Sequence, residues 1–130
     1  MGRSGFEKLE VYRLSEKLAD ATWKLVRRWD QFSQSTVGRQ LIRAADSVGA
    51  NVAEGFGRGT PADNMRFVRI ARGSLYESKH WLRCAFRREL INSDEVDRIR
   101  PLLDELAPRL NAYLNSIGAP RKASTKESDL

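Results

Sequence analysis

The stretch "SVGANVAEGFGRGTPAD", residues 47–63, joins two amphipathic segments through a predicted turn. Gly57 and Gly59 can take a positive φ at little cost, so they are typical of the end of a helix. Thr60 suits the N-cap of a following helix, and Pro61 suits its first position. The segments on both sides are apolar on one face, so this stretch predicts two helices joined by a short turn.

Helical periodicity extends outward from this turn along the chain. Apolar residues recur every three or four positions in four segments, and no segment alternates as a strand would. Short links between amphipathic helices predict an all-α fold, an antiparallel up-and-down four-helix bundle over residues 1–118, followed by a disordered polar tail over residues 119–130. The helices are expected at about 7–29, 36–56, 61–90 and 93–118, with turns near 31–35, 57–60 and 91–93. We expect Ser35 or Thr36 to cap the second helix and Asn92 or Ser93 to cap the fourth.

Two prolines interrupt an otherwise regular fourth segment. Its apolar residues follow gaps of three and four from Val96 to Ile117. Pro101 and Pro108 each remove one backbone donor, which costs roughly 3 kcal/mol inside a helix. Because the apolar seam continues through both prolines, we expect one helix with a kink.

Length and composition limit the class of protein. The 130 residues suit one domain with a real core, and the formal charge of +6 with a pI near 9.9 permits a polyanionic partner. No apolar run is long enough to span a membrane, and the N-terminus lacks a signal-peptide pattern. The single cysteine, Cys84, has no metal-ligand cluster around it, so the simplest interpretation is a cytoplasmic protein without metal or cofactor.

A polar stripe lies beside the apolar stripe of the second helix. Its spacing matches that of a polar stripe on the third helix, so we expect the polar side chains of both stripes to be partly buried and to need hydrogen-bond partners. Gly49, Gly55 and Gly73 could let the backbones of neighbouring helices approach closely. The alternative is a metal or acid/base site at Asn51, Glu54 and Glu77, but bundle metal sites usually use Glu-x-x-His pairs, and the one histidine, His80, projects away from the Glu77 side. The expected structural network is Gln40, Ser47, Asn51, Glu54, Ser74 and Glu77.

A basic stripe runs along the third helix. Between Pro61 and Leu90, basic residues exceed acidic ones by four (seven against three), whereas the fourth segment is net acidic. Such a stripe can neutralise phosphates, and an interleaved aromatic can stack a base. The alternative is a solvated face, or arginines paired with Asp104, Glu105 or a neighbouring subunit. The candidate nucleic-acid-binding residues are Arg66, Arg69, Arg72, Tyr76, Lys79, Arg83 and Arg87.

Residues 39–78 also carry a family resemblance. The segment "RQLIRAADSVGANVAEGFGRGTPADNMRFVRIARGSLYES" resembles four-helix-bundle proteins encoded by intervening sequences in bacterial 23S rRNA genes. Their pattern reads roughly Q-L-x-R-A-x-x-S-x-x-x-N-I-A-E-G-x-G-R, followed by I-A-x-G-S-L-x-E. Val52 stands where the pattern has Ile, and the resemblance covers about residues 6–117. The first part is matched by Gln40, Leu41, Arg43, Ala44, Ser47, Asn51, Ala53, Glu54, Gly55, Gly57 and Arg58, and the second by Ile70, Ala71, Gly73, Ser74, Leu75 and Glu77.

This resemblance implies an antiparallel four-helix bundle that assembles as a ring of five. One relative, the accessory protein of diversity-generating retroelements, is similarly basic and is thought to bind nucleic acid and a reverse transcriptase. For most members of the family no biochemical activity is established. The resemblance therefore favours a homo-oligomer, here a pentamer, without fixing a partner.

Two functions remain open from the sequence. The leading hypothesis is a non-enzymatic oligomeric adaptor that binds RNA or DNA through its basic helix face. The alternative is a structural or protein-binding oligomer without a nucleic-acid role, since Trp23 and Trp29 suit a subunit interface, whereas Trp81 suits the core. An enzyme is disfavoured because "GFGRG" follows no strand and no nucleophile with a base is evident.

Overall fold

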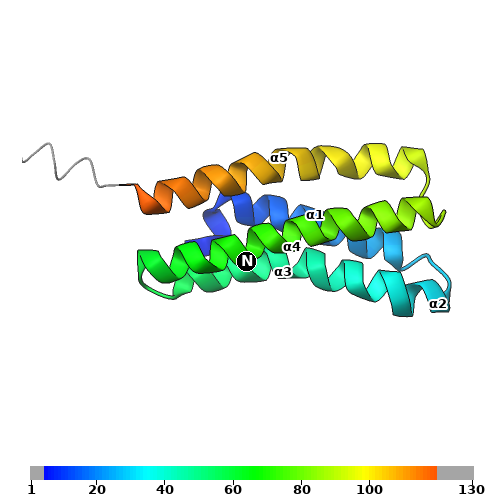
Figure 1. The fold of residues 1–130 in the computed structure, drawn as a ribbon, viewed down its shortest axis with the longest axis horizontal. Coiled ribbons are helices and arrows are strands. Elements are labelled where there is room, and N and C mark those ends of the chain that lie inside the picture. The colour runs from blue at the N-terminus through cyan, green and yellow to red at the C-terminus, as the bar shows by residue number, and fades with distance from the viewer. Residues whose placement is uncertain (1–4, 120–130) are drawn as a thin grey trace, which may run out of the picture.

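Four long helices make up the fold in the computed structural model, which describes residues 5–119 (Figure 1). Successive long helices run antiparallel, and no strand occurs between residues 5 and 119, which confirms the predicted all-α four-helix fold. The predicted tail, residues 119–130, lies outside the described residues apart from Ala119. The long helices are α1 (Glu10–Val26), α3 (Arg39–Gly57), α4 (Pro61–Arg87) and α5 (Ser93–Gly118), and the short elements are η1 (Gly5–Lys8), α2 (Gln31–Ser33) and η2 (Gln34–Gly38).

The helices pack in the ring order α1, α3, α4, α5. Helices α1 and α4 each pack on both α3 and α5, so α1 and α4 occupy opposite corners of the bundle (Figure 1). The fully buried leucines come from every long helix, and burying one leucine side chain contributes about 1.5–3 kcal/mol. Within the described part of the chain, no helix is both long and apolar enough to cross a bilayer. These core leucines are Leu18, Leu41, Leu75, Leu106 and Leu110.

The helical run that contains α3 begins earlier than the sequence pattern predicts, because α2, η2 and α3 follow one another directly from residue 31 to residue 57. Asp30 is the N-cap of α2 at the start of this run: one carboxylate oxygen accepts the Ser33 N–H at 2.9 Å and the other accepts the Ser33 hydroxyl at 2.8 Å. These hydrogen bonds from Ser33 lower the pKa of Asp30. The expected caps, Ser35 and Thr36, lie inside the helical run, where both hydroxyls donate to the Phe32 carbonyl. The predicted turn at 31–35 is therefore wrong, because residues 27–30 make the turn and residues 31–57 continue as helix.

The spacing of buried residues explains why the chain forms the π-helix η2. Ser33, Val37, Leu41 and Ala45 are all buried and lie four residues apart. An α-helix has 3.6 residues per turn, so four-residue steps would carry these side chains away from the core. A π-helix turn, with its i→i+5 hydrogen bonds, is wider, so it keeps Ser33 and Val37 turned toward the core.

The turns on either side of α4 follow the predicted capping chemistry. The Thr60 hydroxyl accepts the Asp63 N–H at 3.2 Å, and Gly59 takes a φ of +93°. At the other end, the Asn92 side chain accepts the Glu95 N–H at 2.8 Å, while the Glu95 carboxylate accepts the Asn92 N–H at 2.9 Å. This reciprocal pair is a capping box, so Asn92, and not Ser93, caps α5.

Of the three glycines expected to allow close backbone approach, two do so. A Cβ on Gly55 would lie 2.7 Å from the Asn64 side-chain oxygen on α4, and one on Gly49 would lie 3.3 Å from the Ser15 Cβ on α1. Gly73 is different, because apart from its chain neighbours and the nearby backbone of its own helix no described atom lies within 4 Å of the Cβ position there. The expectation is wrong at Gly73 because this residue lies on the exposed face of α4.

Helix α5 passes through both of its prolines without a break (Figure 1). Pro101 and Pro108 are both exposed, so the carbonyl groups deprived of a donor lie on the side of the helix that water can reach. The apolar residues between them, including Leu103 and Leu106, stay buried. The prediction of a single helix is confirmed.

Candidate nucleic-acid interface

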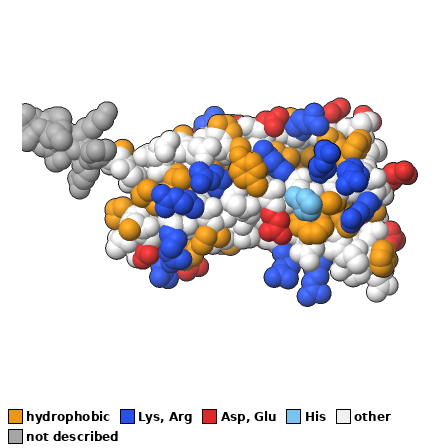
Figure 2. Space-filling view, in the orientation of Figure 1, with side chains coloured by type: hydrophobic (Ala, Val, Ile, Leu, Met, Phe, Trp, Pro, Cys, Tyr) orange, Lys and Arg blue, Asp and Glu red, His pale blue; other side chains and the backbone are white. Residues whose placement is uncertain are grey.

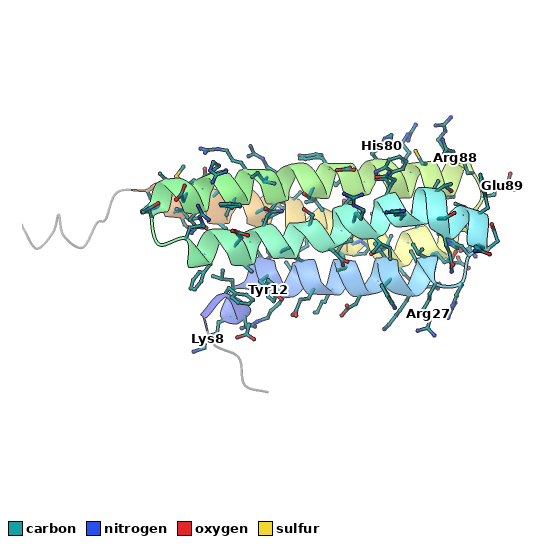
Figure 3. The ribbon with its side chains drawn as sticks, turned by 90° about the horizontal axis from the view of Figure 1, so that it is seen from below. Lys8, Tyr12, Arg27, His80, Arg88 and Glu89 are labelled. Carbon is teal, nitrogen blue, oxygen red and sulfur yellow. The ribbon has the colours of Figure 1, made fainter. Side chains whose placement is uncertain are left out.

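The predicted basic stripe lies on the outer face of α4. Figure 2 shows this face, with Lys and Arg side chains on both sides of the single histidine and apolar and white patches between them. Figure 3 shows His80 and Arg88 projecting from the α4 side of the bundle, while Lys8, Tyr12 and Arg27 lie on the opposite side. Of the seven stripe residues, Arg72 and Lys79 are half-buried, and the exposed ones are Arg66, Arg69, Tyr76, Arg83 and Arg87.

Two arginines of the stripe have partners within the chain. The Arg66 guanidinium lies 4.4 Å from the centre of the Phe67 ring and 3.8 Å from an Asp63 oxygen. The Arg72 guanidinium donates to the Asn111 side-chain oxygen on α5 at 3.0 Å. These contacts hold both side chains against the bundle, so they are less available to a ligand than their neighbours.

The remaining cations of the stripe have no neutralising partner among residues 5–119. Among residues 5–119, no carboxylate lies within ion-pair distance of Arg69, Arg83 or Arg87. The Lys79 ammonium lies 5.1 Å from the centre of the exposed Tyr76 ring, a cation–π contact. Pairing with Asp104 or Glu105, the alternative open from the sequence, does not occur for these residues, since Glu105 pairs with Arg109 instead.

Two residues beside the stripe were not predicted from the sequence. Phe86 on α4 is 48% exposed, and Arg100 on α5 lines the same groove between α4 and α5 as Lys79 and Arg83. Helical spacing alone indicates that Phe86 and Arg83 are neighbours on α4. It could not place Arg100 beside them, because that position depends on how α5 packs on α4.

Hydrogen bonds join three members of the predicted polar network across α3 and α4. The Ser74 hydroxyl donates to the Ser47 hydroxyl at 3.0 Å. The Asn51 amide donates to the Ser47 carbonyl at 2.8 Å and to the Ser47 hydroxyl at 2.9 Å. All three side chains are half-buried. This short chain of hydrogen bonds satisfies polar groups at the helix seam.

The other three predicted members lie outside this seam. Glu54 is exposed and pairs with Arg58 at 3.6 Å, while exposed Glu77 accepts the indole N–H of Trp81 at 3.1 Å. Gln40 is also exposed. The expectation of burial is wrong for these three residues, because their long side chains reach solvent.

An open groove of about 560 Å³ covers the polar seam, but its charges are mixed. Arg43 lines it together with Asp46 and Glu77. Partial burial raises the pKa of the Asp46 carboxyl, and the Asp20 carboxylate on α1 adds to this effect. One cation beside two acids gives a polyanion no net attraction, so this groove is a weaker candidate than the stripe.

The described part of the chain has few side chains arranged to bind a metal ion or to act as a nucleophile with its base. Residues 5–119 contain no group of three or more His, Cys, Asp or Glu side chains able to hold a metal ion. The buried Cys84 sulfur lies 3.7 Å from His80 Nε2, a pairing not predicted from the sequence although the residues are one helical turn apart. Among the described residues, no third side chain hydrogen-bonds the His80 ring to orient it as a base.

Comparisons with known proteins agree with this architecture. A solved structure from Bacteroides thetaiotaomicron, described as a protein of unknown function from the S23 ribosomal protein family, matches with a TM-score of 0.71 and 23% identity, over 80% of this chain and 97% of that one. At this identity the match shows the shared fold alone. No curated protein matches the chain. The family model for the 23S rRNA-intervening sequence protein matches residues 7–112. This chain therefore belongs to the 23S rRNA-intervening sequence protein family.

Proposed function

We propose that the protein is a non-enzymatic adaptor that works as a homo-oligomer and binds RNA or DNA through the outer face of α4. One observation carries this proposal: Arg69, Arg83 and Arg87 are exposed on one helix with no carboxylate within ion-pair distance among residues 5–119. Unneutralised cations on a surface attract phosphate groups and release their condensed counterions. The formal charge of +6 supports the same preference.

The experiment is a salt titration of binding to mixed RNA and DNA. Log affinity should fall linearly with log salt concentration, because each phosphate that is neutralised releases counterions. Arg69→Glu with Arg83→Glu should weaken RNA and DNA binding together and lower the slope by roughly one for each phosphate that is no longer neutralised. Both side chains are exposed, so helix content should not change.

The matched control reverses two charges on the opposite corner of the bundle. The side chains of Lys17 and Arg27 are exposed on the α1 side and make no hydrogen bond or ion pair with other residues of 5–119, whereas Arg13 donates to the Glu7 and Lys8 carbonyls and its replacement would disturb η1. Lys17→Glu with Arg27→Glu should leave most of the affinity intact. Equal losses of affinity in both double variants would mean that net charge alone attracts the polyanion and that α4 is not a site.

The second candidate is a structural or protein-binding oligomer with no nucleic-acid role. Trp23 is 58% exposed and Phe32 is 75% exposed, and large exposed aromatics are enriched at protein interfaces. Trp29 and Trp81 instead pack partly buried against the core. If no polyanion binds at low salt, this second function is the better explanation of the surface.

A further inference from the structure

The groove between α4 and α5 combines an apolar floor with an exposed aromatic ring. Its volume is about 360 Å³. Leu82, Ile99 and Leu103 line it and are each less than a tenth exposed, whereas Phe86 also lines it with 48% of its surface exposed. A flat ligand can therefore lie on the Phe86 ring with apolar side chains beside it.

The same groove has a cationic rim. Lys79 and Arg83 reach it from α4 and Arg100 from α5, against one acid, Asp97. In the described part of the chain, no carboxylate lies within ion-pair distance of any of these three cations. Three cations against one acid leave two net positive charges at the groove, so an anionic ligand is favoured there.

This combination fits a single strand better than a duplex. Phosphates are held by cations, and an unstacked base can lie on an aromatic ring, whereas the bases of a duplex are already stacked on each other. An amphipathic peptide helix needs anchors over two turns of a longer groove, and about 360 Å³ is at the small end of ligand sites. We propose that this groove binds single-stranded nucleic acid, with one base stacked on Phe86 and the flanking phosphates held by Lys79, Arg83 and Arg100; this rests on the proposed function above.

Tyr76 gives the strand a second aromatic surface outside the groove. It precedes Phe86 by ten residues on α4, a distance of about 15 Å along a helix that rises 1.5 Å per residue. At about 3.4 Å per nucleotide, a stacked strand of roughly four nucleotides covers this distance. Lys79 connects the two surfaces, because it lines the groove while its ammonium lies beside the Tyr76 ring.

The test compares four fluorescein-labelled probes by anisotropy across a potassium chloride titration. The probes are a twelve-nucleotide oligothymidine, an abasic strand with the same phosphates, a hairpin duplex and an acidic amphipathic peptide. Oligothymidine should bind at least about fivefold more tightly than the abasic strand, because stacking one base contributes that much. The hairpin should bind less tightly than oligothymidine at equal phosphate number.

Variants at the groove separate stacking from charge. Phe86→Leu should lower oligothymidine affinity toward that of the abasic strand without changing the salt slope, with stacking on Tyr76 accounting for any difference that is left, while Phe86→Tyr should retain binding because it keeps the ring. Arg100→Gln should reduce the slope by about 0.7, the value for one phosphate of a single strand. Phe56→Leu is the matched control, since Phe56 is 44% exposed on α3 away from the groove, and it should have no effect.

The outcomes distinguish this inference from the proposed function. If oligothymidine and the abasic strand bind equally, or if the duplex binds more tightly, the groove is not a stacking site, although the nucleic-acid proposal stands. If Phe56→Leu matches Phe86→Leu, the inference is also overturned. If no oligonucleotide binds at low salt, both proposals fail, and binding of the acidic peptide would then assign the groove to a protein partner.

Discussion

Glu89 has a backbone conformation that favours glycine. Its φ is +63°, and it is the one non-glycine residue between 5 and 119 with a positive φ. It ends α4 in a Schellman motif, in which the Leu90 N–H donates to the Ala85 carbonyl at 2.8 Å and the Glu89 N–H donates to the Phe86 carbonyl at 3.0 Å. An acidic side chain at the negative end of a helix is a second unfavourable feature.

Replacing Glu89 with glycine should therefore stabilise the protein. We expect Glu89→Gly to raise the free energy of unfolding by about 0.5–1 kcal/mol, because glycine takes a positive φ without steric strain. Urea unfolding followed by circular dichroism measures the change. Glu89→Ala removes the charge but keeps a Cβ, so it should gain less. Equal gains in the two variants would assign the effect to the charge and contradict the backbone explanation.

The start of the helical run over residues 31–57 depends on Asp30, the N-cap of α2. The pKa of this carboxyl is lowered by its hydrogen bonds with Ser33, so its contribution is present above the ordinary pKa of 3.8 and is lost as the pH falls through the lower folded value. Asp30→Ala should destabilise the protein at pH 7, and the difference from the unaltered protein should shrink at pH values below 3.8.

Thermal unfolding at several pH values tests this cap. Asp30→Asn should keep most of the stability at pH 7, since its amide oxygen still accepts the Ser33 N–H, but it should lose the pH dependence. Ser35→Ala and Thr36→Ala are the comparison, because these residues were the caps expected from the sequence. A larger effect at position 35 or 36 than at position 30 would restore the predicted boundary.

Helix boundaries show how far sequence reasoning reaches at the level of elements. Thr60 is predicted as a cap, and Asn92 is one of two predicted candidates beside Ser93, because each is a capping residue at the start of an apolar period. The second helix was misplaced because its first turns, "DQFSQS", are polar and were interpreted as a break. The four-residue spacing from Ser33 to Ala45 was the available signal, but it indicates a wide helical turn only if those residues are known to be buried.

The candidate sites show the limit of periodicity. An angular position around a helix predicts neighbours such as Ser47 and Ser74, which hydrogen-bond as expected. It does not predict how deep a long side chain lies, which is why Glu77 was expected to be buried and is exposed. The lining of the groove between α4 and α5 depends on how these two helices pack on each other, so Arg100 could not be placed there from the sequence.

At the scale of the whole molecule, we expect the protein to assemble through its α1 side. Sedimentation velocity should give a species larger than the 14.8 kDa monomer, and a pentamer is the form that the family resemblance implies. Trp23→Gln with Phe32→Gln should shift it toward the monomer, because exposed tryptophan is a common anchor of subunit interfaces. Tyr76→Gln is the control on α4. A monomer at micromolar concentration for the unaltered protein would refute the assembly.

Because α1 and α4 lie on opposite corners of the bundle, substitutions on these two helices should affect the free energy independently of each other. Trp23 lies on α1 and Arg83 on α4, so a change at one and a change at the other lie on opposite corners of the bundle. Changes at distant sites without shared partners usually have additive free energies. In a double-mutant cycle built on the monomer, the coupling energy between these two positions should be close to zero. A coupling that appears only at concentrations where subunits associate would therefore show that one polyanion contacts the α4 faces of more than one subunit.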